Sequence, residues 1–331
     1  LNLIFADLYS TELRDVRDEV FDDFSSNHGH LGSPKHDHNN RRADPGSAIV
    51  NSIQDATKRM KIMRAGLSRG LGECQRLYKD ELWDCSFYNK SVTGNLPDFV
   101  QRTLPYANKE TAFLHAITTA GILQEIVSQC AANKITECSC DKKAQRTSRC
   151  GNNLTFAAEV TLNLLRPRPQ GNNDRREIDE KNQNVGIEVF KGNYKNCLSR
   201  VPKKCDKWQE VAKELKNKYQ SAVKSNNVQQ QQLSMGKVFR RNHMQLLVLT
   251  YQDSSPDYCQ RNVTAGSPGL EGRVCGNDRK KTRHCRSLCR QCGLKLMRER
   301  RGSPINTVTV CRQRKRSHQN RKGHNKGNRS P

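Results

Sequence analysis

The chain of 331 residues is poor in apolar and aromatic side chains, which make up 34% and 6% of it. Even with its 21 glycines added, the apolar share stays below the roughly 45–50% of ordinary globular domains. No apolar run approaches the ~20 residues that a membrane-spanning helix needs, so we expect no membrane span. A chain with so thin a core needs disordered segments, covalent cross-links or both.

Cysteine is abundant where apolar residues are scarce. The chain has 14 cysteines, an even number, and most lie close to another in sequence. This pattern favours a disulfide framework formed in an oxidising compartment. Asn89, Asn153, Asn262 and Asn328 each begin an N-glycosylation triplet. The chain starts without Met or a basic n-region, so we expect a mature, secreted extracellular protein whose signal peptide has been removed.

The charge is strongly one-sided, with 58 Lys and Arg against 33 Asp and Glu and a net charge of +25. Such a balance calls for a polyanionic partner. In an extracellular protein that partner is heparan sulfate on proteoglycans, and we expect no nucleic acid. The candidate contacts are Arg279, Lys280, Lys281, Arg312, Arg314, Lys315 and Arg316. For the cluster at Arg279, an ordinary solvated charged surface explains the pattern nearly as well.

A second class of function also fits the charge: a basic nucleic-acid-binding protein with a Cys-rich zinc module. The zinc ligands would be Cys285, Cys289 and Cys292 beside His284. The segment 312–331 has no aromatic residue and so offers no platform for base stacking. Counting free thiols separates the two interpretations, because a zinc module keeps its cysteines reduced.

Apolar periodicity predicts a mainly helical first part. A helix is expected from Asp44-Pro45, where Asp is a good N-cap, to its end near Gly70 and Gly72. The central helix is expected to begin after Asn108, with Glu110 in its first turn, and to place one apolar face toward the core. Further helices are expected over 153–165 and 208–223, a loop over 166–184, and a strand over 246–251.

These patterns divide the chain into five segments. Residues 1–43 form a flexible acidic and His-rich arm, 44–224 a helical domain and 225–256 a linker; 257–311 form a cysteine-rich domain and 312–331 a disordered basic tail. The four histidines of the arm lack a rigid element that would orient them as metal ligands. We expect no metal, no cofactor and no catalytic site. His115 lies among apolar neighbours in the sequence, and we expect it to be a packed core histidine.

Three separate blocks carry a family resemblance. ECQRLYKDELWDCS, ETAFLHAITTAGILQEIVSQC followed by CSCD, and SPDYCQRNVTAGSPGLEGRVC occur in this order. They resemble the closing segment of the first helix, the central helix with its Cys-x-Cys-Asp exit, and the entry to the C-terminal domain of the Wnt family. The resemblance implies a disulfide-rich α+β protein with a helical N-terminal domain and a small cysteine-knot-like C-terminal domain of β-hairpins.

The resemblance also implies a pairing for all the cysteines. In the first domain it pairs Cys74 with Cys85, Cys130 with Cys138, Cys140 with Cys150, and Cys197 with Cys205. In the second it pairs Cys259 with Cys292, Cys275 with Cys285, and Cys289 with Cys311. As a Wnt-like ligand the protein would bind the cysteine-rich domain of a Frizzled-type receptor.

Two family elements are missing. The hairpin that ends in an acylated serine has Lys203 and Lys204 before Cys205, and its one serine, Ser199, is out of register. The C-terminal hairpin with a Trp-Cys-Cys tip is replaced by the basic tail. This pattern is similar to divergent family members that carry no lipid. The resemblance then implies signalling through Frizzled without lipidation, and antagonism of Toll–Dorsal signalling.

Overall fold

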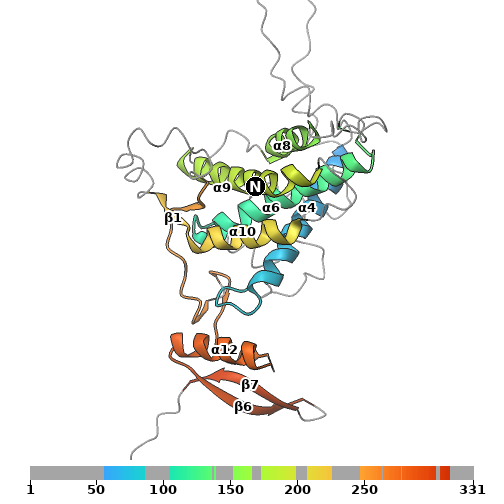
Figure 1. Cartoon of the computed structure of the whole chain (residues 1–331). Coiled ribbons are helices and arrows are strands. Elements are labelled where there is room, and N and C mark those ends of the chain that lie inside the picture. Colours follow the sequence, from blue (N-terminus) through green and yellow to red (C-terminus); the bar gives the residue numbers. More distant parts are fainter. Residues whose placement is uncertain are drawn as a thin grey trace, which may run out of the picture. The chain divides into compact units, whose positions relative to one another are not determined.

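Among the described residues of the first part of the chain, four helices are arranged around a fifth, α6 (Figure 1). The computed structural model describes residues 56–85, 104–135, 138, 152–165, 173–198, 207–225, 247–262, 264–276, 278–302 and 306–313. The described parts of Leu1–Lys79, Trp83–Pro256 and Val263–Gly266 form unit 1. Those of Asp80–Leu82, Asp257–Asn262 and Ser267–Pro331 form unit 2. Each unit is described by itself.

Unit 1 contains the four predicted helices and one helix, over 173–198, that was not predicted. They are α4 (Ala56–Tyr78), α6 (Lys109–Ala131), α8 (Asn152–Leu165), α9 (Asn173–Leu198) and α10 (Trp208–Gln220). Two short parallel strands, β1 (Val223–Lys224) and β2 (Thr250–Tyr251), complete the described part of the unit. Within the described part of the strand expected over 246–251, only the last two residues are strand.

The start of α6 follows the sequence, but its burial goes further. Asn108 caps the helix as predicted, since its Oδ1 accepts a hydrogen bond from the Thr111 amide at 2.9 Å. The predicted apolar face is buried, but burial extends beyond it, because every residue from Glu110 to Leu123 is buried. The helix packs against α4, α8, α9 and α10, so its threonines and His115 are buried together with its apolar residues. A helix surrounded on all sides needs no polar face.

The prediction that the first helix ends near Gly70 and Gly72 is wrong, since α4 continues to Tyr78. Gly70 serves close packing instead: a Cβ there would lie 2.8 Å from the carbonyl oxygen of Ile117. Gly66 and Gly121 meet in the same way, and a Cβ on Gly121 would lie 2.3 Å from the Gly66 carbonyl oxygen. These glycines let the backbones of α4 and α6 touch.

Another correction concerns the expected loop over 166–184, because residues from Asn173 onward are helical in α9. The charged residues that suggested a loop form ion pairs one turn apart, Arg175 with Asp179 and Lys181 with Glu177, and such pairs support a helix. On the same helix, the Asn182 side chain donates to the carbonyl oxygen of Thr250 and accepts from its amide, both at 2.9 Å. These two hydrogen bonds join β2 to α9.

Unit 2 combines one helix with short antiparallel sheets. Strands β3 (Arg261–Asn262) and β4 (Ser267–Pro268) pair with each other. Strand β7 (Asn306–Arg312) lies between β5 (Val274–Cys275) and β6 (Lys295–Arg301). Helix α12 (Arg279–Gln291) packs against β5, β6 and β7. This helix differs from the predicted domain of hairpins. Apolar periodicity does not indicate it, because two of its three buried residues are cysteines, Cys285 and Cys289.

Disulfide bonds supply much of the interior of unit 2. Its core consists of Leu270, Cys275, Cys285, Leu288, Cys289, Leu294 and Cys311. The structure joins Cys259 to Cys292, Cys275 to Cys285, and Cys289 to Cys311. In unit 1 it joins Cys74 to Cys85 and Cys130 to Cys138. These are the partners that the resemblance implies. The pairs Cys140–Cys150 and Cys197–Cys205 lie outside the residues whose side chains are described.

Candidate functional site

A stripe of arginines runs along α12 on the side away from its buried residues. Arg279, Arg283, Arg286 and Arg290 are all exposed. They follow one another at steps of four, three and four residues, which places them on one face of the helix. We call these four residues the arginine stripe. Repulsion between like charges one turn apart opposes helix formation, so the stripe must be held in place from the other side of α12.

That other side is bound to the sheet. The buried residues of α12 are Cys285, Leu288 and Cys289, and both cysteines form disulfide bonds to strands, at Cys275 of β5 and Cys311 of β7. At the N-terminus of the helix the Asp278 side chain accepts a hydrogen bond from the Lys281 amide at 2.8 Å. The disulfides and the cap therefore hold the helix in spite of the charge on its outer face.

The arginine stripe differs from the basic residues on the neighbouring sheet. Glu299 of β6 binds Arg312 of β7, with 3.0 Å between Oε2 and Nη2, and also Arg301, with 2.9 Å between Oε2 and Nη2. Hydrogen bonds from Arg312 and then Arg301 lower the pKa of the Glu299 carboxyl to about 2. None of the four arginines of the stripe forms an ion pair with an acidic residue of the described part of the chain.

The predicted glycan contacts are therefore not equivalent in the structure. Arg279 and Lys280 are exposed on α12, whereas Lys281 pairs with Asp278 at 3.2 Å. Arg312 is partly buried and pairs with Glu299. Arg314, Lys315 and Arg316 lie outside the described residues. Arg286 and Arg290 are not among the contacts predicted from the sequence, because α12 was not predicted; their spacing is the signal that identifies them.

The glycosylation triplet at Asn262 lies on the surface. Asn262 of β3 and Thr264 after it are both exposed in the structure. Asn153 falls in the first turn of α8, in a part whose side chain is not described, and Asn89 lies outside the described residues. Val263 between them lies outside the described residues, so the structure shows only that the acceptor asparagine and the threonine are exposed.

The four sulfur atoms of Cys275, Cys285, Cys289 and Cys311 lie within 4.8 Å of one another and are buried. That spacing also suits zinc, but zinc binds thiolates, and here the sulfurs are joined in two disulfide bonds. Cys292, a ligand of the alternative zinc module, is bonded to Cys259. In this oxidised form the cysteines hold unit 2 together and do not offer metal ligands.

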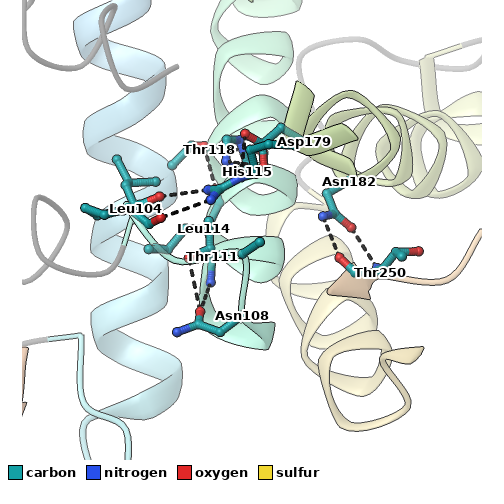
Figure 2. A network of polar contacts seen from close by, with 12 residues as sticks. Leu104, Asn108, Thr111, Leu114, His115, Thr118, Asp179, Asn182 and Thr250 are labelled. Atoms are coloured by element: carbon teal, nitrogen blue, oxygen red, sulfur yellow. Dashed lines mark hydrogen bonds and ion pairs between the residues drawn. The ribbon is translucent and has the colours of Figure 1, made fainter. Parts of the chain in front are cut away.

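Unit 1 contains a buried polar network (Figure 2). His115 of α6 is 1% exposed, and its Nε2 lies 3.1 Å from Oδ1 of Asp179 on α9. Asp179 also accepts from Nε of Arg175 at 3.0 Å, and Arg175 Nη2 donates to the carbonyl oxygen of Leu104 at 2.7 Å. The network connects two helices with the segment that leads into α6.

The electrostatics of this network favour a charged Asp179. Burial raises the pKa of the Asp179 carboxyl, but the charge and hydrogen bond of His115 and those of Arg175 outweigh burial and lower the pKa below its usual value. His115 has almost no contact with solvent, and its Nε2 faces Asp179. Such a histidine cannot reach a substrate, so the network holds the fold together, as the sequence analysis expected of His115.

No helix of the described part of the chain is long and apolar enough to cross a membrane. The structure thus defines a class: an α+β protein with a helical unit, a second unit built on disulfide bonds, and a cationic outer helix. The model of the Wnt family matches residues 47–306. The chain therefore belongs to the Wnt family of signalling ligands.

Individual relatives agree with this assignment. The chain is 28% identical to Wnt-8b of Danio rerio over 281 residues, which cover 75% of this chain and 74% of the relative. It is 29% identical to Wnt-9b of Mus musculus over 258 residues, covering 70% and 67%. A chain of the solved structure "Human WLS in complex with WNT8A" has the same fold, with a TM-score of 0.53 and 19% identity, over 80% of this chain and 96% of that chain.

Proposed function

We propose that the protein is a secreted Wnt-type ligand that binds the cysteine-rich domain of a Frizzled-type receptor without an acyl group. Family membership supports the ligand role. The sequence between Cys197 and Cys205 supports the lack of lipid, since its only serine is Ser199 and lysines stand where the family has the acylated serine. An acyl chain adds about 0.8 kcal/mol per buried methylene, so a lipid-free ligand must gain its affinity from protein contacts.

Two measurements on one secreted preparation test the proposal. Intact mass spectrometry after deglycosylation, with and without reduction, reports any fatty acid. Biolayer interferometry then measures binding to an isolated Frizzled cysteine-rich domain. We expect no acyl mass and a measurable affinity, unchanged in Ser199→Ala. A fatty acid on this loop refutes the lipid-free part, and no binding to any Frizzled domain refutes the receptor.

We further propose that the ligand antagonises Toll–Dorsal signalling, in the manner of the Wnt inhibitor of Dorsal, which has a similarly shortened hairpin. Purified protein added to cells with a Toll-dependent reporter should lower its output. Depletion of the Frizzled receptor should abolish this effect. A reporter that responds equally with and without the receptor contradicts the proposed route.

A second proposal concerns retention on heparan sulfate, and the observation that favours it is the arginine stripe. The stripe offers four guanidinium groups without acidic partners among the described residues, and guanidinium suits sulfate because its donors lie in a planar fork. The test is salt elution from heparin. Replacing all four arginines by Gln should lower the eluting salt concentration more than the control Lys61, Lys79, Lys134 and Lys213→Gln, which removes four exposed charges of unit 1. Equal shifts refute a specific site.

A further inference from the structure

The first 24 residues carry a charge opposite to that of the rest of the chain. They contain seven acidic residues and two arginines, a net charge of −5 in a protein of net charge +25. The acidic residues are Asp7, Glu12, Asp15, Asp18, Glu19, Asp22 and Asp23. Four of them, at 12, 15, 19 and 22, follow at steps of three, four and three residues. In a helix these four would share one face.

The acidic segment matches the arginine stripe in length and in number of charges. The four acids lie within 11 positions of the sequence, from 12 to 22, and the stripe lies within 12 positions, from Arg279 to Arg290. Each carries four charges at alternating steps of three and four residues. The segment is therefore complementary to the stripe both in sign and in spacing.

We propose that residues 7–23 bind the arginine stripe of the same chain and thereby compete with sulfated glycans for it. The inference rests on the same stripe as the proposed glycan site. The connection from residue 24 to the start of α4 at Ala56 is 32 residues long, which can span about 100 Å. A tether of this length gives an effective concentration of up to about a millimolar, so a weak contact suffices for occupancy.

The physical reason for binding is the uncompensated charge of α12. Each arginine of the stripe has an arginine neighbour three or four residues away and no acidic partner in the described residues. A facing row of carboxylates removes this repulsion and adds charge-assisted hydrogen bonds. The contact lies at an exposed surface, so salt weakens it, and at 1 M ionic strength the Debye length falls to ~3 Å.

Zero-length cross-linking of the full chain tests the contact directly. A carbodiimide activates a carboxylate, which then forms an amide bond with a lysine amine and releases the carbodiimide as a urea. Arg283→Lys and Arg286→Lys keep the charge of the stripe and supply the amines. A mixture of 14N- and 15N-labelled protein separates links within one chain from links between two chains.

We expect links from residues 7–23 to positions 283 and 286 within one chain, and their loss in 1 M NaCl. They should also be lost in Glu12→Gln, Asp15→Asn, Glu19→Gln and Asp22→Asn combined. The matched control replaces Glu159, Glu177, Glu180 and Glu210 of unit 1 by Gln, all of them exposed, and should retain the links. No links to these positions, links mainly to lysines of unit 1, or links only between differently labelled chains would each overturn the proposal.

This test contains no glycan, so its result is independent of the glycan site. The consequence for glycans is measured on heparin. Neutralising the four acids of the segment should raise the eluting salt concentration beyond that of the control variant, although both gain the same charge. Equal elution refutes the competition. Failure of the glycan site itself appears separately, as no difference between the four-arginine variant and its own control.

Discussion

The close contact between α4 and α6 predicts how replacing Gly121 by alanine changes the stability of unit 1. Alanine in a helix interior usually stabilises by about 0.5–1 kcal/mol relative to glycine. At Gly121 the added Cβ would lie 2.3 Å from the carbonyl oxygen of Gly66, a backbone atom of a packed helix that cannot rotate away. Overpacking of this kind costs about 1–3 kcal/mol. We therefore expect Gly121→Ala to destabilise unit 1 by about 1–2 kcal/mol net.

The control is Gly72→Ala in α4, because nothing lies within 4 Å of a Cβ at that position. It should keep the normal gain of about 0.5–1 kcal/mol. Helix α9 offers a second matched pair: a Cβ on Gly186 would lie 2.2 Å from the carbonyl oxygen of Ala116, and one on Gly192 has no neighbour within 4 Å.

The measurement is thermal denaturation of the protein with its disulfides intact, monitored by far-UV circular dichroism and by tryptophan fluorescence. Trp83 is buried in unit 1 and stacks with Tyr219, with 6.0 Å between the ring centroids. For a unit of this size, 1 kcal/mol corresponds to about 2–4 °C in Tm. Gly121→Ala should therefore melt below the wild type and Gly72→Ala above it. If Gly121→Ala proved as stable as Gly72→Ala, the direct backbone contact between the helices would be wrong.

Two further predictions concern ionisation. The carbon-13 NMR titration of the Glu299 carboxyl should have its midpoint near pH 2, and Arg312→Gln should move it toward the ordinary value of about 4.3; a normal midpoint in the wild type contradicts the ion pair. Asp179→Asn leaves the Arg175 guanidinium without its acidic partner and should cost about 1–3 kcal/mol at pH 7. Because the folded-state pKa of Asp179 is lowered, its contribution is present above the unfolded value near 3.9 and disappears as the pH falls below it, so wild type and variant should converge in acid.

The sequence predicts the helices of unit 1 well where a cap or a long apolar repeat is present. Asn108 correctly predicts the start of α6, and the apolar patterns at 153–165 and 208–223 correspond to α8 and α10. The predicted end of α4 at Gly70 is wrong because glycine often ends a helix. Here Gly70 instead packs against the backbone of Ile117, which only the tertiary structure brings near. The charged stretch after Asn173 was misread because its ion pairs exist only once the helix has formed.

The candidate site was harder to predict than the fold. The basic residues were visible in the sequence, but their grouping on one face depends on α12, which was missed. Arg312 looks like part of a basic tail in the sequence, yet it ends β7 and pairs with Glu299 through a cross-strand contact. The residues between Cys197 and Cys205, which carry the proposal on acylation, lie outside the described structure.

The anchoring of α12 by sulfur has a consequence for how this surface can change over time. Because covalent bonds at Cys285 and Cys289 fix the helix, its outward residues contribute little to keeping it folded. Substitutions there can alter charge, and with it the choice of binding partner, at small risk to the fold. A helix fixed in this way allows related proteins to evolve binding to a new partner while the fold stays the same.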